Sequence, residues 1–269
     1  MQRVEPGLVH SWDLLAGRPR TYRGRRTVLA AGTIESAKIA LLSGLPNPLI
    51  GRGITDHTIR FRHFALPPGS LGIGPGESAK IALRHPAAAP GAHGFLMVVE
   101  IGANLNQSRY VDPTNLERER AVRAGWTECE VVVLFPAALA PGNAVTLQGP
   151  DPATRARLVL ERVAPPATDL AEADRLVADL LTGLGAQPIL GEAGGPGLQD
   201  ALLGGVAHEV GTLRMGTDPA ASVVDPDLAF HGIPDLYACD NSVLPSSPAA
   251  NPSLTTAALA LRLAAQLST

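Results

Sequence analysis

The sequence contains few of the residues that mark several common classes of protein. Of its 269 residues only 2 are cysteines, so at most one disulfide can form, between Cys129 and Cys239, and no CxxC or other metal-type spacing exists. The formal net charge is −3, which argues against a surface built to bind nucleic-acid phosphates. These shortages exclude a disulfide scaffold and a basic nucleic-acid-binding domain, and they predict no metal site.

Long apolar runs are also missing. The longest apolar helical pattern, Leu254 to Leu267, contains Arg262 and is shorter than the roughly 20 residues that a membrane span needs. Met1 is not followed by a basic segment and an apolar stretch of the kind found in signal peptides. We therefore expect a cytoplasmic protein with neither a membrane nor a nucleic acid as its partner.

What the chain does contain is enough apolar material for a large core. Hydrophobic residues make up 45% of the chain and charged residues 17%, as in ordinary globular proteins. With 28 glycines and 24 prolines, we expect many turns between short elements. The length fits one large domain or two small ones.

The patterning divides the chain into three zones. Residues 27–44 read as a short apolar strand, a turn at Gly32 and a helix, which is typical of a parallel α/β sheet. Residues 58–150 alternate like antiparallel strands between Pro/Gly loops, and residues 167–186 form an amphipathic helix. Strand and helix patterns of the first kind return after residue 206.

These zones predict an α/β plus α+β architecture, in which an antiparallel sheet is inserted into an α/β domain. We place residues 1–57 and 205–269 in the α/β domain and residues 58–204 in the inserted domain. The two outer segments should join in one layer although they are far apart in the sequence.

Two stretches near the carboxy terminus contain candidate site residues. His208 begins "HEVGTLRMG", and Asn251 precedes Pro252 at the start of the last predicted helix. Each has an ordinary interpretation: a lone histidine beside a turn is more often structural, and Asn before Pro is a good helix N-cap. Asp240 ends a predicted strand, where it is either a turn residue or part of a cofactor site at the carboxyl edge of a sheet.

The ordered set of motifs resembles the carboxy-terminal half of the glucose–methanol–choline (GMC) flavin oxidoreductases. The matching stretches, which together span nearly the whole chain, are "TVLAAGTIESAKIALLSG" (27–44), "GRGITDH" (51–57), "HEVGTLRMG" (208–216) and the segment from "VVDPDLAFHG" through "ANPSLTTAALALRLA" (223–264). The combination is specific, although no single piece is.

The resemblance implies an enzyme that oxidises a CH–OH group, possible substrates being a sugar or polyol, by hydride transfer to N5 of FAD. His208 matches the family's active-site histidine, which accepts the hydroxyl proton. Asn251 matches the partner position that hydrogen-bonds the substrate oxygen. Imidazole, with an ordinary pKa of about 6.5, suits a general base near neutral pH. An amide NH₂ suits an oxygen on which negative charge develops.

The resemblance also implies which residues contact the cofactor. Ala31 and Gly32 match a strand–turn on the adenosine side of FAD. Asp240 and Asn241 match the segment beside the ribityl and pyrophosphate groups. Pro252 and Ser253 match a helix N-terminus that meets the flavin ring and stabilises negative charge. The implied domains are thus an incomplete Rossmann-like FAD-binding domain (1–57 and 205–269) and a substrate-binding domain (58–204).

The chain departs from the family in one large respect. Full-length members begin with a strand–GxGxxG–helix unit that cradles the pyrophosphate, and this sequence contains none. The nearest stretch, "GIGPGES" at 72–78, has its third glycine one place early and no apolar strand before it. We therefore expect an amino-terminal FAD-binding partner subunit, or a truncated product. The alternative is a non-catalytic remnant or binding subunit. A serine hydrolase is excluded because the chain has no GxSxG elbow.

Overall fold

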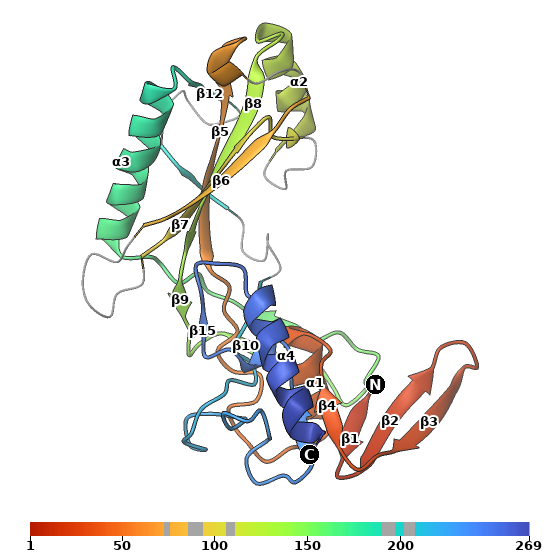
Figure 1. Cartoon of the computed structure of the whole chain (residues 1–269). Coiled ribbons are helices and arrows are strands. Elements are labelled where there is room, and N and C mark those ends of the chain that lie inside the picture. Colours follow the sequence, from red (N-terminus) through yellow and green to blue (C-terminus); the bar gives the residue numbers. More distant parts are fainter. Residues whose placement is uncertain (73–75, 86–93, 106–110, 190–196, 202–207, 269) are drawn as a thin grey trace. The chain divides into compact units, whose positions relative to one another are not determined.

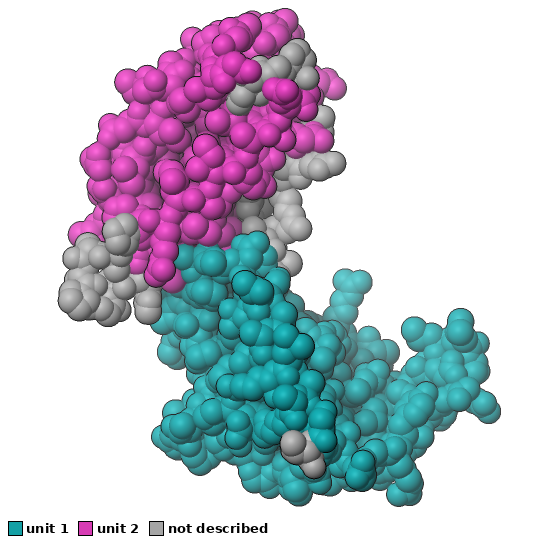
Figure 2. Space-filling model, in the orientation of Figure 1, with its two compact units in different colours: residues 1–56, 137–163, 206–269 teal, residues 57–136, 164–205 magenta. Residues whose placement is uncertain are grey.

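The computed structural model describes residues 1–72, 76–85, 94–105, 111–189, 197–201 and 208–268. The chain forms two compact units, which Figure 2 colours separately: unit 1 contains residues 1–56, 137–163 and 206–269, and unit 2 contains residues 57–136 and 164–205. Within the described ranges, no helix has both the length and the apolar character needed to cross a membrane. The glycine-rich loop 72–78 includes residues 73–75, which lie outside the described part.

Unit 1 combines short strands with two helices (Figure 1). Its strands are β1 (Arg3–Glu5), β2 (Leu8–Asp13), β3 (Arg18–Arg23), β4 (Thr27–Leu29), β9 (Ala137–Ala138), β10 (Ala144–Thr146), β11 (Arg157–Val159), β14 (Leu236–Ala238) and β15 (Ser246–Ser247). Its helices are α1 (Thr33–Leu42) and α4 (Ser253–Leu267), together with the short 3₁₀ turn η4 (Asn241–Val243).

The two outer segments of the chain meet in a parallel strand pair. Leu236 of β14 lies opposite Thr27 of β4, and Ala238 lies opposite Leu29. Leu29 and Ala238 are fully buried, in a core that also contains residues of α1 and α4. The prediction that the amino-terminal and carboxy-terminal segments share one domain is confirmed by this pairing.

Residues 137–163 belong to unit 1, whereas the sequence analysis placed them in the inserted domain. β9 pairs with β15, and Val145 of β10 packs against Ala37 and Ile54. The side chain of Asn143 links its own segment to the segments around Ile54 and Glu161. Its Nδ2 donates to the carbonyl oxygens of Ile54 (2.9 Å) and Glu161 (3.0 Å), and its Oδ1 accepts from Glu161 N (2.7 Å). These contacts hold the segment in unit 1.

Unit 2 is an antiparallel sheet with a helix on each face (Figure 1). Its strands are β5 (Thr58–Leu66), β6 (Ala79–Arg84), β7 (Leu96–Ile101), β8 (Thr127–Phe135), β12 (Gln187–Ile189) and β13 (Gln199–Asp200), in the order β12-β5-β8-β7-β6, with β13 also pairing with β5. Its helices are α2 (Pro113–Val122) and α3 (Ala167–Gly183), with a 3₁₀ turn, η1 (Ser70–Gly72).

The faces of this sheet follow from strand alternation. On one face, Phe64, Val131 and Val99 pack against Val177 and Leu181 of α3. On the other, Ala65 lies in a smaller cluster with Leu116 of α2. The predicted mixture of an α/β part and an antiparallel α+β part is therefore observed; the functional assignment of the two domains stays a prediction.

Asn143 gives a test of this architecture. Replacing Asn143 with Ala leaves the buried carbonyl of Ile54 and the part-buried carbonyl and amide groups of Glu161 without this partner, so we expect the free energy of unfolding to fall by about 2 kcal/mol. Urea denaturation of the full chain measures the change. The matched control is Gln148→Ala, whose side chain donates only to Arg155 O near the surface (3.3 Å) and should cost less than about 0.5 kcal/mol. Equal losses in both variants would contradict this role of Asn143.

Candidate active site

The segment that follows His208 is tied to the start of α1 by two threonines. Thr212 is fully buried and its Oγ1 donates to Thr33 O (2.7 Å), while Thr33 Oγ1 donates to Glu209 O (2.6 Å). These reciprocal bonds cross more than 170 positions of sequence. They hold residues 209–212 against the turn that joins β4 to α1.

The same segment passes very close to residues 53–55. Thr55 and Val210 exchange backbone hydrogen bonds of 3.2 and 2.8 Å. Gly211 has φ +97, and a Cβ at this position would lie 2.3 Å from Leu139 Cδ2 and 2.9 Å from Gly53 O. Only glycine accommodates both the backbone conformation and the close approach. This is the physical reason for the Gly-Thr pair three residues after His208.

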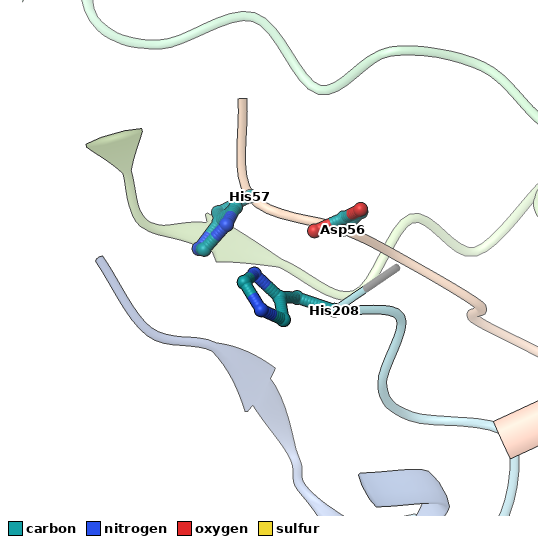
Figure 3. Close-up of side chains that lie close together, drawn as sticks. All are labelled: Asp56, His57 and His208. Atoms are coloured by element: carbon teal, nitrogen blue, oxygen red, sulfur yellow. The ribbon is translucent and has the colours of Figure 1, made fainter. Parts of the chain in front are cut away.

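His208 lies at the edge of this closely packed region, beside Asp56. One ring nitrogen of His208 and one carboxylate oxygen of Asp56, both in unit 1, lie within 4.8 Å of each other. Figure 3 shows both side chains, together with His57, which follows Asp56 directly in the chain. His208 is half-buried, whereas both carboxylate oxygens of Asp56 are buried. Asp56 lies within "GRGITDH" (51–57), a stretch whose sequence alone predicts no role for it.

Arg214 adds positive charge near the same glycines. Its Nη2 donates to Arg52 O (3.0 Å), and its guanidinium lies about 3.5 Å from the position that a Cβ on Gly53 would take. Burial lowers the pKa of Arg214 because desolvation disfavours the charged form. The Nε atom is buried and makes no hydrogen bond within the described ranges.

Asp240 uses its carboxylate to join the two strand ends. Oδ2 accepts from Gly32 N (3.0 Å) and from Ser36 Oγ (2.5 Å), and Oδ1 accepts from Ser242 N (2.8 Å). Asp240 is buried, so this charge is satisfied by three donors of the chain itself. Its side chain thus fastens the turn before α1 to the turn after β14.

The other residues predicted to contact a cofactor surround this link. Ala31 is exposed and Gly32 half-buried, directly beyond the carboxyl end of β4. Asn241 follows β14, and its Oδ1 accepts from Thr256 Oγ1 of α4 (2.5 Å). The structure therefore brings Ala31, Gly32, Asp240 and Asn241 together at one edge of the parallel pair, where open α/β sheets bind ligands.

The start of α4 differs from one sequence expectation. Asn251 was expected to cap the helix if its role were structural, but the N-cap is Pro252 and no side chain caps the helix. The cap position therefore lies one residue past Asn251, at Pro252, which has φ −77 and ψ −10. Asn251 and Ser253 are exposed. The capping explanation for Asn251 is thus wrong, and the approach of Asn251 to His208 stays a prediction.

Neither cysteine is a candidate nucleophile. Both thiols are free, and burial raises the pKa of Cys129 to about 11. Burial also raises the pKa of Cys239, with a further contribution from the neighbouring charge of Asp240. Since the thiolate is the reactive form, burial disfavours both cysteines as nucleophiles.

Part of the chain, including three of the predicted site residues, matches a known protein family. Residues 141–260, which contain His208, Asp240 and Asn251, match the family model described as GMC oxidoreductase. This region of the chain is similar to GMC oxidoreductases.

Curated relatives match shorter stretches of the chain. A C-glycoside 3-oxidase from Microbacterium trichothecenolyticum is 40% identical over 99 residues, covering 35% of this chain and 18% of that protein. A paromamine 6'-oxidase from Streptomyces fradiae is 39% identical over 79 residues, covering 28% and 15%. A pyranose 2-oxidase from Tricholoma matsutake is 40% identical over 55 residues, covering 20% and 10%.

Solved structures match the chain over nearly its whole length. Pyridoxine 4-oxidase from Mesorbium loti aligns with a TM-score of 0.64 and 19% identity, over 98% of this chain and 56% of that one. A formate oxidase structure aligns with a TM-score of 0.60 and 19% identity, over 93% and 55%. The fold is therefore shared, and the chain spans about half the length of these structures.

Gly211 offers a test of the close approach beside His208. A Cβ at residue 211 meets Leu139 and Gly53 and also requires an unfavourable positive φ, so Gly211→Ala should lower the free energy of unfolding by about 3 kcal/mol. Gly142→Ala is the matched control, because a Cβ there meets nothing within 4 Å. Thermal and urea unfolding compare the two. Wild-type stability in Gly211→Ala would show that residue 211 packs less closely against Leu139 and Gly53 than described.

Asp240 allows a separate test of whether its carboxylate is structural. Asp240→Asn weakens three hydrogen bonds and places an NH₂ group against existing donors, so we expect a loss of about 2 kcal/mol in the chain without any cofactor. The measurement is urea unfolding in flavin-free buffer. Asp218→Asn, which removes an exposed-turn carboxylate accepting only from Ala220 N, should lose far less. If stability changed only when flavin was present, Asp240 would act on the cofactor instead.

Proposed function

We propose that the chain forms part of an FAD-dependent oxidoreductase that oxidises a CH–OH group, with His208 as the base. The observation that carries the proposal is the position of His208. It lies within the GMC-matched region, on a segment that is bonded to the β4–α1 turn through Thr33 and Thr212. Backbone pairing to residues 53–55 holds the same segment, so the His208 imidazole is attached to a rigid part of the backbone.

The residues at the carboxyl edge of the parallel pair fit an FAD. Ala31 is exposed there, and the 15-residue helix α4 begins nearby in sequence with no side-chain cap. Ser253 and Leu254 in its first turn are exposed, so backbone N–H groups at this end are available to an anionic group. Asp240 is committed to the chain itself, and we therefore assign cofactor contacts to the backbone around Gly32 and Asn241 and to the Pro252–Ser253 end of α4. FAD, when bound, supplies the hydride acceptor.

The chain's own residues would handle the proton and the oxygen of the substrate. A neutral imidazole at His208 accepts the hydroxyl proton as the C–H bond breaks. The NH₂ group of Asn251, which is not used as a helix cap, donates a hydrogen bond to the oxygen on which negative charge develops. These two roles require the imidazole of His208 and the amide of Asn251 to lie on one side of the reacting carbon.

The substrate class is proposed from the relatives. The matched proteins include oxidases named for a C-glycoside and for a pyranose. We therefore favour a sugar or a related polyol over a simple alcohol. Unit 2, with its antiparallel sheet, is the part of the chain to which we assign substrate recognition.

We further propose that an amino-terminal FAD-binding partner completes unit 1. Parallel sheets are normally larger and covered on both faces, but β4 and β14 form a sheet of two strands within the described ranges. Helix α4 packs through Leu259, Leu263 and Leu267, while Leu254 and Leu261 are 82% and 75% exposed. The exposed apolar residues recur at helical spacing along α4: Leu254, Ala257, Ala258, Leu261, Ala264 and Ala265. Such a stripe is suited to a covering module.

A non-catalytic binding subunit is the second candidate. It is favoured by the length of the match, because the chain spans 56% of the pyridoxine 4-oxidase structure. A subunit of this kind would keep the fold and bind a partner without holding a reactive flavin.

Purification of the tagged chain from its own host, with any partner it retains, separates these candidates. We expect a yellow complex whose flavin is bleached anaerobically by one member of a panel of sugars and polyols. His208→Ala should retain the flavin spectrum and bleach slower by roughly 10²-fold or more, the usual contribution of a general base.

Three results would decide against parts of the proposal. A colourless complex favours the binding subunit. Bleaching at the wild-type rate in His208→Ala removes His208 from the mechanism. Stoichiometric, alcohol-reducible flavin on the chain purified alone removes the need for a partner. His231→Ala is the matched control, because His231 hydrogen-bonds Ser222 Oγ (2.8 Å) and should leave the bleaching rate unchanged.

A further inference from the structure

The pair formed by Asp56 and His208 is the feature of unit 1 that the proposed chemistry leaves unexplained. The two side chains are separated by more than 150 positions of sequence, yet a carboxylate oxygen and a ring nitrogen lie within 4.8 Å (Figure 3). No metal-type spacing or helical periodicity predicts this neighbourhood. It arises because the chain segments around residues 55 and 210 pair through their backbones.

The carboxylate of Asp56 is shielded from water, so its charge acts strongly on neighbouring polar groups. Both oxygens of Asp56 are buried although the residue as a whole is only half-buried. A carboxylate removed from water requires hydrogen-bond donors or positive charge, and its interactions are stronger in the lower local dielectric. An imidazole N–H at His208 is a donor of the right kind.

The backbone around both residues is held firmly enough to keep them together. On one side, Thr55 Oγ1 donates to Gly53 O (3.1 Å) and accepts from Ala140 N (2.9 Å). On the other, Glu209 O accepts from Thr33 Oγ1 (2.6 Å). The residue before Asp56 and the residue after His208 are thus each fixed by a side-chain hydrogen bond. The backbone on either side of the pair is therefore held in place.

We propose that Asp56 is a positioning residue for His208: its carboxylate accepts a hydrogen bond from one ring nitrogen, so that the other nitrogen, unprotonated, faces the substrate. A separation of up to 4.8 Å is closed by a rotation of the ring or by one bridging water. The inference rests on the proposed function only in naming the substrate as the group opposite.

The consequence for the proposed reaction is a defined tautomer. Neutral imidazole carries its proton on either nitrogen, and only the bare nitrogen can accept the proton of a hydroxyl group. A carboxylate at one nitrogen fixes the proton there. The same carboxylate also stabilises the imidazolium formed when the hydroxyl proton arrives.

The test reads the tautomer directly. Histidine-selective ¹⁵N labelling of the full chain and two-bond ¹H–¹⁵N correlation, at a pH where the rings are neutral, report which nitrogen of His208 carries the proton. His208→Gln and His57→Gln assign the signals. EDTA is present throughout, since carboxylate and imidazole together also bind divalent metals. We expect one dominant tautomer in the wild type.

Replacing Asp56 with Ala should raise the minor tautomer of His208 roughly tenfold relative to the major one, the effect of one charge-assisted hydrogen bond. Asp56→Asn keeps the shape of the side chain and removes its charge, and it provides the same comparison if Asp56→Ala unfolds. Asp56→Glu should restore the wild-type preference at least in part. Glu209→Gln removes a carboxylate adjacent to His208 in sequence but outside the pair, and should leave the tautomer unchanged.

A wild-type tautomer ratio in both folded Asp56→Ala and Asp56→Asn overturns the inference, as does an equal shift in Glu209→Gln. The measurement needs neither flavin nor substrate. Failure of the proposed enzymatic function, seen as a colourless or unreactive complex, is therefore distinguishable from failure of the Asp56–His208 inference.

Discussion

The carboxylate of Asp240 is the contact on which the arrangement of unit 1 depends. It binds Gly32 N and Ser36 Oγ, which lie 208 and 204 positions away in sequence, and Ser242 N within its own turn. By joining the turn before α1 to the turn after β14, it brings the ends of both parallel strands to one edge. The residues proposed to contact FAD lie along that edge, so a single buried charge organises the surface that a cofactor would approach.

The second constraint is steric rather than electrostatic. Gly211 lets the segment after His208 pass against Leu139 and Gly53, and Thr212 then reaches Thr33 O from a fully buried position. The proposed role of His208 requires a fixed ring, and pairing and close packing hold the backbone next to it. The Gly211-Thr212 pair therefore has a structural cause that is independent of chemistry, and the proposed chemistry uses the rigidity that results.

Much of this fold follows from sequence pattern, because its elements have clear periodicity. The strand at 27–29, the helices α1, α3 and α4, and the strands β7 and β8 are all apolar at the expected spacing. β5 is different, since Arg60, Arg62 and His63 interrupt its apolar residues. Arg60 binds Asp174 (3.0 Å), and Arg62 is only 3% exposed, so that burial lowers its pKa. Buried charges of this kind defeat a hydrophobic pattern.

The candidate site was predictable in its parts and not in its geometry. His208 and Asn251 came from motif resemblance, but the neighbourhood of Asp56 and His208 depends on backbone pairing between distant segments, which no local pattern encodes. The capping prediction for Asn251 failed for a related reason. Sequence preference places Asn at the cap before Pro, whereas in the structure the cap position is one residue later and no side chain caps the helix.

The division of unit 1 among three chain segments has a consequence for the order of folding. Unit 2 is completed by residue 205, so all of its strands can pair while the ribosome is still adding the carboxy-terminal segment. Unit 1 cannot close until β14 and α4 have been made, because β4 has its parallel partner only then. Pairing between segments so far apart in the sequence is slow. Until β14 and α4 are made, the apolar residues of the amino-terminal segment remain exposed. Chaperone dependence during synthesis should therefore be concentrated in the amino-terminal segment.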